Sequence, residues 1–321
     1  MKVFAPIAVF GFNRPQHLER TLQSLAANPE AADTPIHLFC DGPRGPEDEA
    51  LVAEVHALMD RFAEGRRAAT VHKSPVNLGL AASITQGVAR ILEDHDRFIV
   101  VEDDLVLSPH FLKFMNEALE AYRDRPEVGC VTGYMYPVPL REPKAVLLPF
   151  VTSWGWGTWG DRWKDFNPDG RSLAREIARQ GRRREFDLNG SFHMWGMLQD
   201  QVHGYNSSWW IRWQATLFLK GSLTVWPGMS LLLNKGMDGT GTHCGPQSHL
   251  EGLLADRPIE VDGTLTAPSS AYMEAIQAFL APHRHSDFMM AIRRRVPKRF
   301  FARVLRPMAH RLARLRGGAE G

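Results

Sequence analysis

The apolar run Phe98–Val101 ends in three adjacent carboxylates, Glu102-Asp103-Asp104. Four consecutive apolar residues that include Val-Val are typical of a strand buried on both faces of a parallel sheet. In open α/β sheets, the residues that follow such strands lie at the carboxyl edge, where ligands bind. Three adjacent carboxylates repel one another and offer the oxygen ligands that Mg²⁺ and Mn²⁺ prefer. This segment therefore favours a metal site over a solvated acidic turn.

Strand and helix signals alternate through the first 135 residues. We expect strands at Pro6–Phe10, Ile36–Cys40, Ala69–His72, 98–101 and Val128–Thr132, and helices at about 14–27, from Pro46, at Leu80–Glu93 and at Pro109–Arg123. This alternation predicts an α/β fold in which helices cover both faces of a mostly parallel sheet. The sequence leaves the strand order open.

After Tyr134 the sequence becomes irregular and rich in proline, glycine and tryptophan, and most of the nine tryptophans of the chain lie here. A tryptophan ring can stack on a sugar or fill a core. We expect a division between the two roles, with some rings at an acceptor sugar and the rest structural. The residues expected near the acceptor sugar are Trp154, Gly155, Trp156, and Trp209 or Trp213.

The end of the chain is strongly basic. The segment from Phe288 to Ala319 contains ten Lys and Arg residues and no acid. The formal net charge of the whole chain is +2, so the rest of the chain carries 2 − 10 = −8. Apolar residues at spacings of three and four among these cations predict an amphipathic helix at 288–316. Anionic lipid headgroups would attract it. The alternative is a helix packed on the folded body or on a partner chain.

We expect three parts: 1–135 and 136–245 as halves of one domain, and 246–321 as a linker, a helix at Tyr272–Leu280 and the helical basic tail. The three scattered cysteines show no disulfide or zinc spacing, which indicates a reducing compartment. No signal peptide and no apolar run of about 18 residues is visible. We therefore expect a cytoplasmic protein, peripheral at the inner membrane face, and no binding to nucleic acid.

Several motifs, in order along residues 3–245, resemble GT-A glycosyltransferases, in particular N-acetylglucosaminyltransferase I and its bacterial relatives. The motifs are Phe10-Gly11-Phe12-Asn13-Arg14-Pro15, Asp41-Gly42, Val101-Glu102-Asp103-Asp104-Leu105, the Gly-Trp segment 154–160, Asp200 and His243. The resemblance implies a GT-A fold and a bound Mn²⁺ or Mg²⁺. It also implies inverting transfer of a sugar from a nucleoside diphosphate sugar, expected to be UDP-linked, to a glycan or glycolipid hydroxyl.

The resemblance assigns the donor side of the site. Asp104 would bind a metal ion that bridges the two phosphates, while Glu102 and Asp103 would accept hydrogen bonds from ribose or sugar hydroxyls. Asp41 would bind the base through its N–H. Arg14, beside a helix N-terminus suited to an anion, would contact base or phosphate, and its alternative is a plain surface charge.

Other assignments compete with plainer structural roles. Asn77, in Asn77-Leu78-Gly79, would line the base pocket or simply form a turn, and a turn is equally the alternative for Asp41. Asp200 is the expected catalytic base, with Asp161 and Asp165 as rivals. Gln199 precedes Asp200, at a position where the family often has an acidic residue. His243 would be a second metal ligand or diphosphate contact, or a structural hydrogen-bonding residue.

Two other functional classes remain open. A sugar-1-phosphate nucleotidyltransferase also uses a metal and an α/β sheet, but its first strand should lead into a glycine-rich basic loop, which residues 11–15 do not form. A non-catalytic carbohydrate-binding protein would use the tryptophan-rich surface. Release of sugar from a nucleotide sugar would separate these classes.

Overall fold

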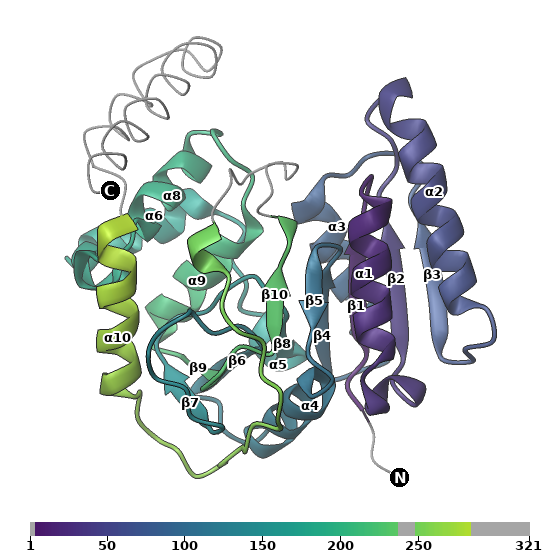
Figure 1. Cartoon of the computed structure of the whole chain (residues 1–321). Helices are drawn as coiled ribbons and strands as arrows, with labels where there is room; N and C mark the ends of the chain where they lie inside the picture. The colour runs from purple at the N-terminus through teal and green to yellow at the C-terminus, as the bar shows by residue number, and fades with distance from the viewer. Residues whose placement is uncertain (1–3, 237–247, 284–321) are drawn as a thin grey trace, which may run out of the picture.

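The computed structural model describes residues 4–236 and 248–283, and an eight-stranded sheet runs through its centre (Figure 1). The strand order is β3-β2-β1-β4-β8-β6-β9-β7, and a separate two-stranded sheet pairs β10 with β5. The strands are β1 Ile7–Gly11, β2 Ile36–Cys40, β3 Ala69–Lys73, β4 Arg97–Glu102, β5 Leu105–Leu107, β6 Val128–Thr132, β7 Ala145–Leu148, β8 Trp156–Trp159, β9 Leu223–Pro227 and β10 Leu232–Asn234.

The helices connect and cover these strands. They are α1 Pro15–Ala26, α2 Pro46–Ala63, α3 Leu80–Ile91, α4 Phe111–Ala121, α5 Gly160–Trp163, α6 Gly170–Arg179, α7 Arg183–Phe186, α8 Met194–Val202, α9 Trp209–Lys220 and α10 Ser270–Leu280. The expected strands and helices of the first 135 residues are therefore confirmed to within a few residues. Pro15 and Pro46 each stand in the first turn of a helix, where the missing N–H costs nothing.

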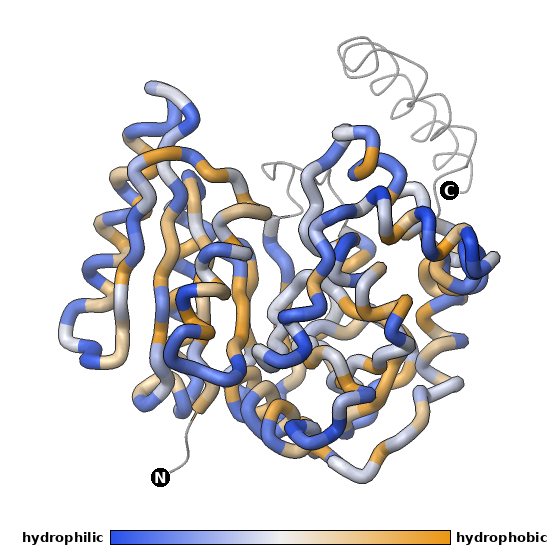
Figure 2. Tube along the Cα trace, turned by 180° about the vertical axis from the view of Figure 1, so that it is seen from behind, coloured by the Kyte–Doolittle hydropathy of each residue, from blue (hydrophilic) through white to orange (hydrophobic). Residues whose placement is uncertain are grey.

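The two faces of the sheet bury separate sets of side chains. Ile7 and Val9 of β1 pack with residues of α1, α2 and α4, whereas Ala8 and Phe10 pack with residues of α3 and α9. Successive strand residues point to opposite faces, and both faces are covered, in keeping with the orange, hydrophobic stretches within the sheet in Figure 2. The predicted α/β class with helices on both faces is confirmed.

The order of the first four strands creates a crevice. The chain passes from β1 to β2 and β3 on one side, then returns to form β4 on the other side of β1, and all these strands are parallel. The loops after β1 and β4 leave the same edge of the sheet, but the next strands of the sheet along the chain, β2 and β6, lie on opposite sides of this pair. A topological switch point of this kind is where open α/β sheets bind ligands.

Residues Trp156–Trp159 of the Gly-Trp segment form a strand, β8. β8 runs antiparallel between β4 and β6, with Trp156 opposite Val100 and Trp159 opposite Arg97. Gly157 allows this close pairing, because a Cβ there would lie 2.8 Å from the Phe98 carbonyl oxygen. β8 and β9, from the predicted half 136–245, thus pair with strands of the predicted half 1–135 in a single sheet.

The described part of the predicted linker is attached to the body. The Ala255 N–H donates to the Ser230 carbonyl at 2.7 Å, and the Glu260 N–H donates to the Pro143 carbonyl at 2.8 Å. The predicted helix at 272–280 is confirmed as α10, whose Tyr272 is buried. His243 and the basic segment 288–316 lie outside the described residues. Within those residues, every helix is too short or too polar to cross a membrane.

Candidate functional site

Arg14 and the acidic triplet meet at the switch point. Arg14 ends the loop after β1 and precedes the first turn of α1, while β4 ends at Glu102. Phe10 of β1 lies opposite Glu102 of β4, so the two loops leave the sheet side by side. The Arg14 guanidinium contacts the carboxylate of Asp103 and lies 3.0 Å from Asp104 Oδ2. The structure thus brings together residues that are about ninety positions apart in the sequence.

Asp103 is engaged within the protein. Its carboxylate contacts Arg14 and accepts a hydrogen bond from the Phe12 backbone, and only 4% of the residue is exposed. Thr21 Oγ1, from the buried face of α1, donates to the Asp103 carbonyl at 2.7 Å. In this conformation Asp103 positions Arg14, and its predicted contact with a ribose or sugar hydroxyl remains a prediction. Thr21 was not predicted as a site residue, although a polar residue on the apolar face of a helix is a usable signal.

The two carboxylate oxygens of Asp104 have different surroundings. Oδ2 faces Arg14, whereas Oδ1 is buried and receives no hydrogen bond from the described residues. The Lys235 N–H donates to the Asp104 carbonyl at 2.8 Å, which brings the chain after β10 against this loop. Gly236 then lies on Oδ2 so closely that any Cβ would overlap it. Gly236 was also missed, because only the pairing of β10 with β5 brings it here.

This donor set fits a hard divalent cation. A buried carboxylate oxygen without a donor is costly unless a cation satisfies it, and Glu102 supplies a second, half-buried carboxylate beside it. The described residues contain no cluster of three or more metal-ligating side chains. Mg²⁺ sites in nucleotide enzymes commonly have one or two protein carboxylates and take their other ligands from phosphate and water.

The electrostatics of the triplet also favour a cation. Burial raises the pKa of Glu102, and repulsion from Asp104 and Asp103 raises it further, although Arg14 opposes the shift. The pKa of Asp103 is raised mainly by burial, against the attraction of Arg14. Burial works against the charge on Arg14, but the two aspartates outweigh it and hold the Arg14 pKa above its usual value. One guanidinium thus compensates three crowded carboxylates only in part.

Asp41 anchors the turn that precedes α3. Its Oδ1 accepts the Leu78 N–H and its Oδ2 accepts the Gly79 N–H, both at 2.7 Å. Asn77 Nδ2 donates to the Gly42 carbonyl at 2.8 Å, so the predicted Asn77 turn is joined to the end of β2. Asp41 and Asn77 therefore both stabilise a turn, which was the structural alternative for each of them. Contacts from Asp41 or Asn77 to a base remain predictions.

Three of the expected acceptor tryptophans belong to the core. Trp156 and Trp213 are fully buried, Trp209 is 3% exposed, and the Trp156 and Trp209 rings stack at 4.9 Å. Rings packed on one another cannot offer a face to a sugar, so their predicted acceptor role is corrected to core packing. Trp154 is half-buried at the carboxyl edge, where its ring meets Tyr134. Gly155 beside it is buried.

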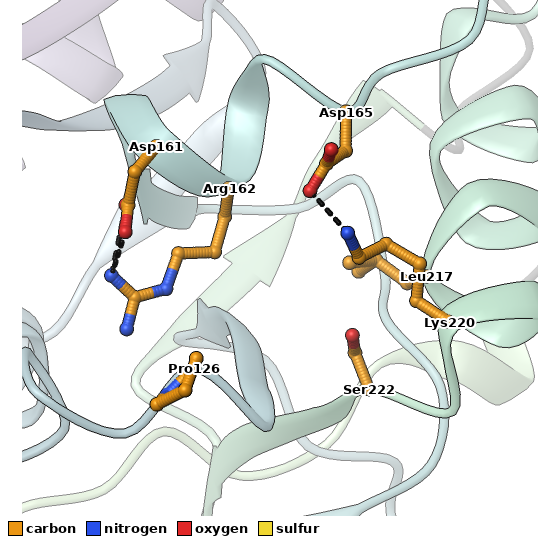
Figure 3. A pocket seen from close by; sticks show the side chains of 7 residues that line it. All are labelled: Pro126, Asp161, Arg162, Asp165, Leu217, Lys220 and Ser222. Carbon is orange, nitrogen blue, oxygen red and sulfur yellow. Dashed lines mark hydrogen bonds and ion pairs between the residues drawn. The ribbon is translucent and has the colours of Figure 1, made fainter.

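Asp161 and Asp165 lie at the wrong edge of the sheet for the predicted base. They line a cavity of about 110 Å³ with Pro126 and Ser222, which precede β6 and β9 (Figure 3). Asp161 follows β8, whose last residue pairs with the first residue of β4, Arg97. A second cavity, of about 400 Å³, is also lined by Asp161 and by residues that precede β4. Both cavities therefore lie opposite the acidic triplet.

Asp200 lies in α8 and is 2% exposed. α8 and the carboxyl ends of β1 to β4 lie toward the same, upper side of the molecule in Figure 1. This arrangement is compatible with one active-site edge, whereas the positions of Asp161 and Asp165 are not. The role of Asp200 as a base remains a prediction.

No protein-family model and no curated protein matches the sequence. Solved structures overlap it in part. PcManGT, a mannosyltransferase from Pyrobaculum calidifontis solved with GDP-Man and Mn²⁺, gives a TM-score of 0.38 at 11% identity, over 51% of this chain and 46% of its own. GalNAc-T7, solved with UDP, GalNAc and Mn²⁺, gives a TM-score of 0.47 at 8% identity, over 72% and 43%.

A putative glucose-1-phosphate thymidylyltransferase from Bacillus anthracis, in complex with a sucrose, also overlaps the structure. Its TM-score is 0.29 at 10% identity, over 46% of this chain and 61% of its own. The overlap covers less than two thirds of the length of each of these three proteins. Likeness at this level gives no evidence on activity.

Proposed function

We propose that the protein is a metal-dependent, inverting GT-A glycosyltransferase. It would move a hexosyl or N-acetylhexosaminyl group from a UDP-linked donor to a hydroxyl of a glycan or glycolipid. One observation carries the proposal. Arg14 and the triplet Glu102-Asp103-Asp104 meet at the switch point between β1 and β4, and one buried Asp104 oxygen is left without a donor among the described residues.

On the donor side, Asp104 would hold Mn²⁺ or Mg²⁺ through Oδ1. When bound, the ion supplies positive charge for the departing diphosphate. Arg14 lies next to the start of α1, whose free N–H groups suit an anion, so its guanidinium can reach a phosphate there. Glu102 is half-buried and receives no hydrogen bond from the described residues, which leaves its carboxylate for a ribose or sugar hydroxyl.

On the acceptor side, Asp200 would take the proton of the attacking hydroxyl, as a single inverting displacement requires. Its support is the resemblance in the sequence, together with the exclusion of Asp161 and Asp165 by their position at the opposite edge. Trp154 is the expected acceptor tryptophan that keeps part of its ring surface accessible.

The test is release of free sugar from UDP-sugars with and without Mn²⁺. Asp200→Asn should lower the rate on the order of a hundredfold, the contribution of a positioned base, and should leave donor affinity unchanged. Asp161→Asn is the matched control and should keep the wild-type rate. Wild-type rates in Asp200→Asn would refute the assignment.

The same assay separates the other classes. A nucleotidyltransferase would instead release pyrophosphate from a nucleoside triphosphate in the presence of a sugar 1-phosphate. A carbohydrate-binding protein would retain glycans and release no sugar.

The membrane remains a proposed partner of the basic segment 288–316, on the evidence of its sequence. Each Lys or Arg near an anionic surface contributes roughly 1 kcal/mol, and salt screens the attraction. Truncation after residue 287 should release the protein from anionic vesicles and leave transfer to a soluble acceptor intact. Aggregation of the truncated protein would instead indicate that the segment packs on the body.

A further inference from the structure

We infer that Arg14 is a built-in counter-ion of the cation site. Its guanidinium contacts both aspartates, at Oδ2 in the case of Asp104, and a divalent cation at Oδ1 must compete with this positive charge for the same carboxylate. The inference rests on the proposed function, because it takes Asp104 as the residue that binds the cation.

The ion pairs that support this inference are largely buried. The side chain of Arg14 is 21% exposed, that of Asp103 is 5% exposed and that of Asp104 is 12% exposed. Charges removed from water interact more strongly than charges at the surface. Among the ion pairs of residues 4–236 and 248–283, no other Lys or Arg pairs with either aspartate. Among the described residues, Arg14 therefore supplies the positive charge at this pair of aspartates.

The surroundings show which partner can move. Gly236 lies against Asp104 Oδ2, and Asp104 is fixed further by the hydrogen bond from Lys235 to its carbonyl. Asp103 is held by Thr21 and Phe12. The Arg14 guanidinium has no hydrogen-bond partner in the described structure except these two carboxylates. Other contacts thus hold the aspartates, whereas in the described structure the Arg14 guanidinium is held only by these two carboxylates.

A divalent ion on Asp104 would lie within a few ångströms of this guanidinium, and the two positive charges would repel each other. Arg14 would then weaken or leave its contact with Asp104. Because it stands at the start of α1, it can turn toward a phosphate bound at the same edge. Cation binding and release of Arg14 toward the diphosphate would be coupled.

The test measures binding of Mn²⁺ alone to the full chain, by calorimetry and by the rise in melting temperature that a ligand of the native state produces. The variants are Arg14→Gln, which removes the charge, and Arg14→Lys, which keeps the charge but cannot bridge two carboxylates as a guanidinium does. Arg20→Gln is the control, because Arg20 is exposed on the same helix.

We expect Arg14→Gln to melt at a lower temperature without metal and to bind Mn²⁺ about tenfold more tightly, which corresponds to about 1.4 kcal/mol. Arg14→Lys should fall between Arg14→Gln and the wild type, and it serves as the test if Arg14→Gln does not fold. Arg20→Gln should match the wild type.

Two results overturn the inference and have different meanings. Mn²⁺ binding by the wild type that the Arg14 variants leave unchanged or weaken would show that Arg14 positions Asp104 rather than competing for it, and the proposed function would stand. Absence of Mn²⁺ binding in the wild type and in every variant would contradict both the competition and the proposed metal site.

Discussion

Replacing Asp41 tests whether its carboxylate holds the β3–α3 turn in place. Asp41 is 8% exposed and accepts two backbone hydrogen bonds at 2.7 Å, from Leu78 and Gly79. In Asp41→Asn one oxygen becomes an NH₂ group, so one N–H loses its acceptor and faces another donor. Loss of one hydrogen bond to a charged group costs about 1.5–3 kcal/mol, and we expect a destabilisation of about 2 kcal/mol.

The assay is reversible urea unfolding, together with thermal melting. For a chain of this size, about 2 kcal/mol corresponds to a decrease of roughly 4 °C in melting temperature. Asp33→Asn is the control, because Asp33 is exposed and none of its side-chain atoms hydrogen-bonds within the described structure. An Asp41→Asn protein as stable as the wild type would refute the anchoring role. If it also lost affinity for nucleotide, the predicted contact with the base would be the better explanation.

Two further predictions concern stability. Gly155→Ala should destabilise the protein by about 2 kcal/mol or more, because Gly155 has φ +54° and a Cβ would overlap Leu232. Gly181→Ala, at φ +70° in open space, should cost only about 1 kcal/mol. Equal losses of stability for the two variants in urea unfolding would contradict the steric argument. Burial, followed by repulsion from His72 and His95, lowers the pKa of His37 to about 4, so the folded protein keeps this ring neutral while the unfolded chain takes up a proton. The contribution of His37 to the free energy of unfolding should therefore be present above pH 6.5 and be lost as the pH falls toward 4. Unfolding measured at several pH values should show a smaller decline in His37→Gln than in the wild type. An identical decline would contradict this role of His37.

The first half of the fold could be predicted because its signals are local. Strands such as Ile36–Cys40 are short apolar runs, and Pro15 and Pro46 mark the starts of helices. Arg14 and Asp104 could be placed at one edge for the same reason, since each follows a buried strand. What could not be predicted was how they touch, because that depends on the strand order.

The second half depends on contacts between distant segments. Glycine and tryptophan alternating at 154–160 are compatible with an exposed loop or with a strand, and only the pairing of Trp156 with Val100 selects the strand. That pairing buries the ring that was expected at an acceptor. Gly236 was missed for the same kind of reason, since its place beside Asp104 depends on the pairing of β10 with β5.

The most direct test of the central claim is calorimetric titration of UDP into the wild type and Asp104→Asn, each with and without Mn²⁺. The account predicts that Mn²⁺ strengthens UDP binding in the wild type and has no such effect in Asp104→Asn. The variant should stay folded, because Asp104 lies beyond the end of β4. Binding that is equally metal-dependent in both proteins, with unchanged melting curves, would contradict a cation site at Asp104.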